Sequence, residues 1–247
     1  MAPLRAGHLN WCWNAYAANG DGSEVAVAVL QYSLAPDAKF PTQLRQAVAA
    51  MNYLLDTGID PRNVILGGDS AGGNLAVQLL CHISQPRMGI EVVRLHEGRF
   101  AGIFLVSPWV SGKTKTRSFK DNDDVDMLSK AIVTKTQEQV LLAEDAAVTH
   151  NLPNAALPLD GNLSWFCDIQ RVTEAMYITC GGLEVFRDDI CAFAEAMRIR
   201  NPQMLSTLEI FDGEVHDSIL LEGEHDSIGN AIRGMQEWAL YTLNTTT

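Results

Sequence analysis

Apolar runs and amphipathic segments alternate along this chain, and the alternation constrains its fold more than any other feature. A short run rich in Val, Ile or Leu is typical of a strand that is covered on both faces, whereas apolar residues recurring every three or four positions indicate a helix. Strand–helix units repeated in this way predict an α/β fold with a mostly parallel sheet flanked by helices. Strands are expected at 24–32, 63–68, 99–107 (ended by Pro108), 175–180 and 205–213, and helices at 42–58, 74–84, 130–142, 188–201 and 227–243.

Residues 112–170 interrupt this alternation. They hold the charge cluster KDNDDVD, one helical segment and a stretch rich in Pro, Asn and Leu. We therefore expect a single domain over residues 1–247, in which 112–170 is an insertion that forms a partial helical cap.

Bulk properties exclude several classes of partner. With 30 acidic and 18 basic residues, the 247-residue chain has a formal net charge of −12, which disfavours nucleic acid and a polybasic membrane anchor. The sequence has no run of about 18 apolar residues, so no membrane span is expected. Its first residues, MAPLRAGHLNWCWN, do not resemble a secretory signal, and the five cysteines are scattered. These features predict a cytoplasmic protein.

The stretch VILGGDSAGGNLA, residues 64–76, lies between a predicted strand and a predicted helix. In that setting, its Gly-x-Ser-x-Gly pattern is typical of a nucleophile elbow. Small residues at Gly68 and Gly72 avoid clashes with the neighbouring strand and helix, and Ser70 then stands at a helix N-terminus, which favours developing negative charge. The backbone N–H of Ala71 points to the same space and is the expected oxyanion donor.

The same stretch has a simpler interpretation, a glycine-rich turn in which Ser70 caps a helix. A phosphate-binding loop is disfavoured, because no Gly-Lys-Ser/Thr comes after the glycines. The surrounding strand–helix pattern favours the catalytic interpretation of Ser70.

Two segments, YSLAPDAKFP and GGDSAGGNLA, occur in this order with a predicted helix between them. Together they resemble the hormone-sensitive-lipase-like branch of the α/β-hydrolases, and the resemblance covers nearly the whole chain. It implies an α/β-hydrolase fold and a serine carboxylesterase acting on small or short-acyl esters. No cofactor is implied, and no cluster of metal ligands is seen in the sequence. The family also implies a catalytic triad in the chain order serine, acid, histidine.

The histidine of such a triad is expected in the loop after the last strand. His216, in IFDGEVHDSIL, lies a few residues beyond the strand at 205–213. It would act as general base toward Ser70 and then as general acid toward the leaving alcohol. His225 is the competing candidate, but EGEHDSIGNAI resembles the start of the final helix.

The acid is expected after the strand at 175–180, in the segment CGGLEVFRDDI. The family usually has an Asp here, with a second Asp four residues later. Asp188 matches the second, which places Glu184 at the catalytic position. A carboxylate one methylene longer still orients an imidazole and stabilises its cation. Asp188 and Asp189 are expected at a helix start, and Asp69 is expected to support the elbow.

The family takes its second oxyanion donor from a His-Gly-Gly-Gly loop, a motif that this sequence does not contain. From about residue 6 the chain is similar to the part of the family that lies just beyond that loop, so we expect an N-terminally truncated fold without the first strands. The missing strand would lie between 24–32 and 63–68, which must then pair directly or leave polar backbone groups unpaired. Loss of one oxyanion donor costs about 10²–10³ in turnover.

Two functions are compatible with these features. One is an esterase that uses the triad, and the other is a catalytically inactive α/β-hydrolase relative that binds a small molecule. The complete triad favours the enzyme, whereas the missing loop favours the binding module. Three aromatic residues either line an apolar pocket or belong to the core: Trp109, Trp165 and Phe166. Exposed strand edges favour a homo-oligomer.

Overall fold

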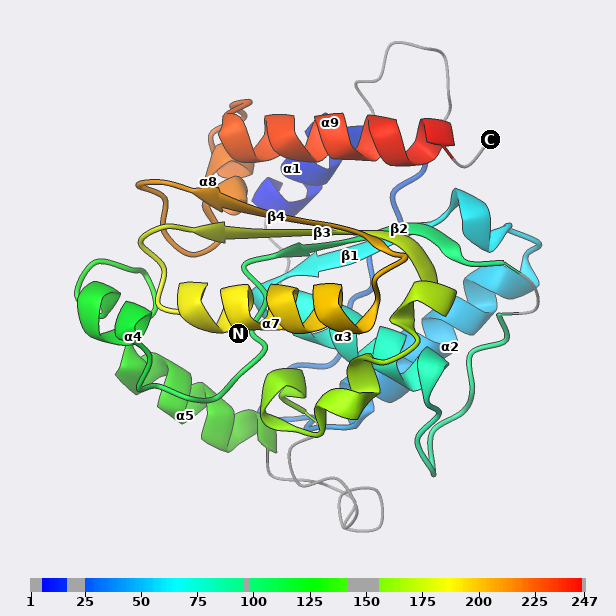
Figure 1. Cartoon of the computed structure of the whole chain (residues 1–247), viewed down its shortest axis with the longest axis horizontal. Coiled ribbons are helices and arrows are strands. Elements are labelled where there is room, and N and C mark those ends of the chain that lie inside the picture. The colour runs from blue at the N-terminus through cyan, green and yellow to red at the C-terminus, as the bar shows by residue number, and fades with distance from the viewer. Residues whose placement is uncertain (1–5, 17–24, 96–97, 142–155, 246–247) are drawn as a thin grey trace.

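The computed structural model describes residues 6–16, 25–95, 98–141 and 156–245. Its centre is a four-stranded parallel sheet in the order β1-β2-β3-β4 (Figure 1). The strands are β1 (Ile65–Asp69), β2 (Phe100–Val106), β3 (Thr173–Gly181) and β4 (Leu205–Phe211). Each overlaps a segment predicted to be a strand, and the parallel α/β architecture is confirmed.

The strand register brings the ends of three strands together. Asp69 pairs with Val106, and Val106 pairs with Thr179, so β1 and β2 end level with each other, two residues before the end of β3. The residues directly after these strands therefore share the carboxyl edge of the sheet, where α/β proteins place their binding sites.

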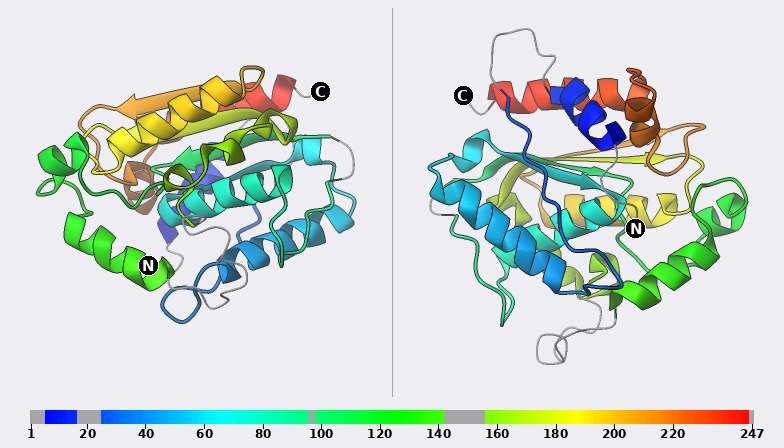
Figure 2. Two further views of the ribbon diagram at one scale, coloured as in Figure 1. Left: turned by 60° about the horizontal axis from the view of Figure 1, so that its bottom comes forward. Right: turned by 180° about the vertical axis from the view of Figure 1, so that it is seen from behind.

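Helices cover both faces of the sheet (Figures 1 and 2). One face carries α1 (Ala6–Tyr16), α8 (Ser218–Glu224) and α9 (Asn230–Thr245), and the other carries α2 (Thr42–Asp56), α3 (Ser70–Ser84) and α7 (Arg187–Arg200). Four of these helices were predicted from periodicity (α2, α3, α7 and α9), whereas α1 and α8 were not. In α1, Trp11 and Ala15 lie four residues apart and are buried, and the Trp11 ring packs edge-on against Phe104 with 5.5 Å between centroids.

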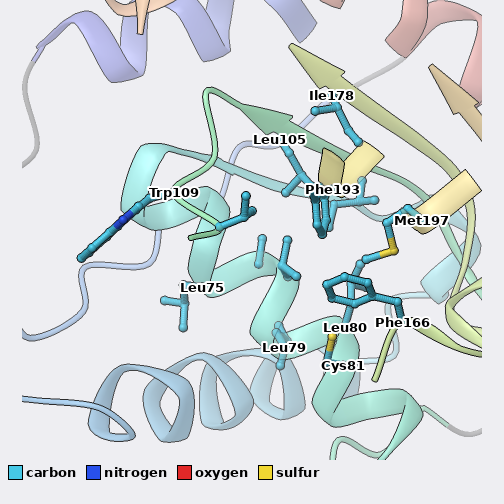
Figure 3. Packing of buried hydrophobic residues seen from close by; sticks show 14 of the residues in the cluster. Leu75, Leu79, Leu80, Cys81, Leu105, Trp109, Phe166, Ile178, Phe193 and Met197 are labelled. Atoms are coloured by element: carbon cyan, nitrogen blue, oxygen red, sulfur yellow. The ribbon is translucent and has the colours of Figure 1, made fainter. Parts of the chain in front are cut away.

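Alternating strand residues supply two hydrophobic clusters, one on each face of the sheet. Phe104 and Tyr177 point to the cluster under α1, α8 and α9, whereas their neighbours Leu105 and Ile178 point to the other. Figure 3 shows this larger cluster, which holds Leu75, Leu79 and Leu80 of α3 together with Phe166, Phe193 and Met197.

The prediction of a strand over 24–32 is wrong for residues 25–32, which are extended chain outside any ladder. Val25 packs on one hydrophobic cluster and Tyr32 on the other, so the segment crosses from one face of the sheet to the other instead of running along β1. Val29 remains 46% exposed. A strand requires a partner for its backbone groups, and no strand among the described residues lies beyond β1.

The segment 112–170 contains α4 (Arg117–Asn122) and α5 (Lys130–Leu141), and α5 matches the predicted helix at 130–142. Short 3-10 turns lie further along at 158–160, 163–166 and 169–171, while residues 142–155 lie outside the described part. That this segment forms a cap stays a prediction. Within the described ranges, no helix combines the length and apolar character that a membrane crossing requires.

Candidate active site

Ser70 stands at the junction between β1 and α3 with a φ of +48°. Non-glycine residues rarely adopt this left-handed conformation, and where they do it commonly marks a functional site. A Cβ at Gly68 would lie 2.5 Å from the carbonyl carbon of Gly72, so Gly68 is required sterically, as predicted. The same expectation for Gly72 is wrong, because a Cβ there would have no neighbour closer than 4.0 Å.

Ala71 is the second residue of α3. An N–H group in the first turn of a helix has no acceptor within that helix. It also lies at the positive end of the helix dipole. The Ala71 amide is therefore suited to stabilise negative charge that develops beside Ser70.

His216 lies against Ser70, with 2.9 Å between its Nε2 and the Ser70 Oγ. The imidazole is buried and packs edge-on against the ring of Phe186. Its backbone N–H donates a 3.0 Å hydrogen bond to Asp126 Oδ1, which fixes the turn after β4. The competing candidate His225 is exposed at the C-terminal end of α8.

Glu184 lies on the other side of the imidazole, with its Oε2 3.8 Å from His216 Nδ1. This distance is longer than a hydrogen bond, although such contacts commonly tighten when substrate binds. The same Oε2 accepts hydrogen bonds from the Ser107 hydroxyl at 2.6 Å and from the Gly181 N–H at 3.2 Å. Asp188 and Asp189 lie in the first turn of α7, as expected from the sequence.

The loop that carries Glu184 is held by residues 118–126. Asn122 donates to the Glu184 carbonyl, Asp126 accepts from the Val185 N–H, and the Ser118 hydroxyl donates to the Val185 carbonyl. Asp126 therefore joins the acid loop to the histidine turn. In the sequence, Asp126 stands out only as part of a charge cluster.

Two further residues of the site were missed in the sequence. Ser107 directly follows β2 with a φ of +43°, and besides Glu184 it contacts the backbone N–H of Asp217. Its position at the carboxyl end of a predicted strand, directly before Pro108, was the available signal. Asp217 follows His216, and its Oδ2 lies 3.4 Å from His216 Nε2.

The electrostatic environment of His216 is set by burial and by carboxylates. Burial alone would lower the pKa of His216, but Asp217, Glu184 and Asp126 together raise it to about 9. Burial raises the pKa of Asp217 to about 7, against the lowering effect of His216. The pair therefore favours a protonated imidazole near neutral pH.

The three aromatic candidates, Trp109, Trp165 and Phe166, belong to the hydrophobic core or pack against it and do not line an open pocket. Trp109 and Phe166 are buried in the larger hydrophobic cluster, and Trp165 packs against it, with the Arg87 guanidinium 5.1 Å from the Trp165 ring centroid. Across the described ranges, no group of three or more His, Cys, Asp or Glu side chains is arranged to hold a metal ion.

Residues 5–220 match the sequence profile of the alpha/beta hydrolase fold. The chain belongs to this family. This confirms the resemblance that the motifs around Ser70 indicated.

Individual relatives extend the comparison. The chain is 25% identical over 218 residues to "Putative steryl acetyl hydrolase mug81" of Schizosaccharomyces pombe and 29% identical over 181 residues to "Acetyl-hydrolase" of Streptomyces hygroscopicus. These matches cover 86% and 73% of this chain but 54% of each relative. The chain thus spans about half the length of these curated relatives.

Solved structures agree with the fold. The structure titled "Crystal structure of EstE5-PMSF (I)" superposes with a TM-score of 0.70 at 25% identity, covering 96% of this chain and 71% of that one. An esterase of the bacterial hormone-sensitive lipase family superposes with a TM-score of 0.67 at 24% identity, covering 88% of this chain and 65% of that one.

Proposed function

We propose that this protein hydrolyses carboxylic esters through Ser70, His216 and Glu184. The observation that carries the proposal is the 2.9 Å contact between Ser70 Oγ and His216 Nε2, made where Ser70 is held at a φ of +48° between a strand and a helix. A serine whose only role is to cap a helix has no need of a buried imidazole on its hydroxyl.

In the proposed reaction, His216 takes the Ser70 proton as Oγ attacks the ester carbonyl carbon. The Ala71 N–H stabilises the oxyanion, and the imidazolium returns the proton to the leaving alcohol. Water activated by the neutral imidazole then releases the acid and restores Ser70. Glu184 stabilises the imidazolium and fixes the orientation of its ring.

We infer further that the acyl group is small. The support comes from the relatives, whose names describe acetyl hydrolases, and from the packing around Ser70, where Trp109 and Ala71 belong to or contact a filled hydrophobic cluster. The alternative of an inactive binding module rests on the missing glycine loop alone, whereas the contact between Ser70 and His216 favours the enzyme.

Hydrolysis of p-nitrophenyl acetate, butyrate and octanoate tests this function. We expect the acetate and butyrate to be cleaved with higher kcat/KM than the octanoate. We also expect Ser70→Ala to lower kcat by about 10³-fold or more. Ser227→Ala is the control, because Ser227 is exposed and its hydroxyl donates to the Glu222 carbonyl in α8. Equal rates for the parent chain and Ser70→Ala would contradict the proposal.

A further inference from the structure

Asp217 has an energetically unfavourable backbone conformation and lies beside His216, the proposed catalytic base. Its φ of +54° lies in the left-handed region, its side chain is buried, and its Oδ1 has no hydrogen-bond partner in the described part of the chain. Backbone strain and a buried unpaired carboxylate oxygen each disfavour the folded state. A residue kept in such an unfavourable arrangement is expected to have a function, and the triad of Ser70, His216 and Glu184 does not include Asp217.

The position of Asp217 identifies that role. Its Oδ2 lies 3.4 Å from His216 Nε2, the same nitrogen that lies 2.9 Å from Ser70 Oγ. His216 thus has a carboxylate near each ring nitrogen, Glu184 near Nδ1 and Asp217 near Nε2. The triad needs only the one near Nδ1, because Nε2 must be free to accept the Ser70 proton.

We propose that Asp217 is a positioning residue that controls when His216 acts as a base. In its ionised form it holds a proton on Nε2 and thereby restricts the activation of Ser70 to alkaline pH. This inference rests on the proposed ester hydrolysis. While Nε2 carries a proton, it donates toward Asp217 Oδ2 and has no lone pair for the Ser70 hydroxyl. As the pH rises, that proton leaves to solvent, and Nε2 becomes able to accept from Ser70.

The surrounding charges leave both members of the pair ionised between about pH 7 and pH 9. Burial raises the pKa of Asp217, Asp69 and Glu184 raise it further, and His216 and His8 of α1 lower it. His216 faces Asp217, Glu184 and Asp126, whose charges raise its pKa against the effect of burial. His8 lies 3.5 Å from Asp69 at the end of β1, so α1 brings a titratable group to the same region.

The test compares two replacements of Asp217 with a matched control. Asp217→Asn removes the charge and keeps the shape, and Asp217→Gly removes the side chain and suits the positive φ. Asp226→Asn is the control, because Asp226 also has a positive φ, +48°, but is exposed. For each variant, kcat/KM for p-nitrophenyl acetate is measured against pH at the isosbestic wavelength of nitrophenol.

We expect the acidic limb of the profile to move to lower pH by about one unit in both Asp217 variants. The corresponding change is an increase of about tenfold in kcat/KM below the midpoint. The Asp226 variant should keep the parent profile. An acidic limb that stays in place in both Asp217 variants would overturn the inference.

A second measurement separates this inference from the proposed function. The pH titration of His216 is monitored by NMR of ¹⁵N-histidine-labelled protein, with His216→Gln used for assignment. We expect the His216 midpoint to fall in Asp217→Asn even if no ester is hydrolysed. Absence of Ser70-dependent hydrolysis would reject the proposed function alone, whereas an unchanged His216 midpoint would reject the role of Asp217.

Discussion

The Ser107 hydroxyl donates a 2.6 Å hydrogen bond to Oε2 of Glu184, and both side chains are buried. The Gly181 N–H donates to the same oxygen at 3.2 Å. These donors hold the carboxylate in place although it stands 3.8 Å from His216 Nδ1. Ser107 also accepts the Asp217 N–H, so one hydroxyl links the acid loop to the histidine turn.

Replacement of Glu184 and of Ser107 should therefore have graded effects on catalysis. We expect Glu184→Gln to lower kcat by about 10³-fold or more, because the imidazolium loses its stabilising charge. Ser107→Ala should lower kcat by about tenfold, because Glu184 keeps its charge but loses its shortest hydrogen bond.

The matched control is Ser111→Ala. Ser111 is also buried and donates to a carboxylate, Asp160, at 2.9 Å, but it contacts neither Glu184 nor His216 through a described hydrogen bond. Steady-state kinetics that show the same kcat for Ser107→Ala and Ser111→Ala would reject a specific role for Ser107.

The glycines of the elbow should differ sharply in their tolerance of a methyl group. Gly68→Ala places a Cβ 2.5 Å from backbone atoms of Gly72, and we expect it to lower the free energy of unfolding by about 1–3 kcal/mol or more. Gly72→Ala has open space and lies in α3, where alanine is favoured over glycine by about 0.5–1 kcal/mol. Urea unfolding measures both, and equal midpoints would contradict the elbow geometry.

Asp189 should make stability depend on pH in a defined direction. Burial raises its pKa to about 7, and Asp160 and Asp188 raise it while Lys113 lowers it. The folded state thus binds a proton more tightly than the unfolded state, so the free energy of unfolding falls as the pH rises from about 4 to 7 and is level above. We expect Asp189→Asn to be more stable than the parent chain at pH 8, by on the order of 1–4 kcal/mol, and to show little difference near pH 4.

Asp188, the neighbour of Asp189, is the control for this prediction, because its pKa is shifted in the opposite direction. Burial opposes ionisation of Asp188, but hydrogen bonds from Ser118 and Arg187 outweigh it and lower the pKa of Asp188. Its contribution to stability is therefore present at neutral pH and is lost as the pH falls through the lowered value. Asp188→Asn should be less stable than the parent chain at pH 8. Thermal unfolding at pH 4, 6 and 8 that shows the same sign for both variants would contradict this account.

The sequence predicted those parts of the molecule that local patterns determine. The elbow at Ser70 carries its own motif, the β-strands are compact apolar runs, and His216 comes soon after the last of them. The predicted strand at 25–32 is wrong because a strand forms only where another strand can pair with it. In the described sheet β1 is an edge strand, and residues 25–32 do not pair with it. An apolar run in the sequence does not indicate whether a partner strand is present.

The residues that support the triad could not be predicted from the sequence, because their roles also depend on distant parts of the chain. Ser107, Asp126 and Asp217 act through contacts with residues far away in the chain, such as the 2.6 Å bond that spans 77 positions between Ser107 and Glu184. These residue types are common in loops. Their roles follow only from the register of the parallel strands and from the contact between Asp126 and the turn that carries His216.

The most direct test of the central claim is covalent labelling of Ser70. The purified chain and Ser70→Ala are treated with a fluorophosphonate probe at pH 9, where the His216 base form is populated, and each is analysed by intact mass spectrometry. We expect the parent chain to gain the mass of one phosphonyl group and Ser70→Ala to gain none. An unlabelled parent chain that is folded by circular dichroism, or equal labelling of Ser70→Ala, would contradict the assignment of Ser70 as the nucleophile.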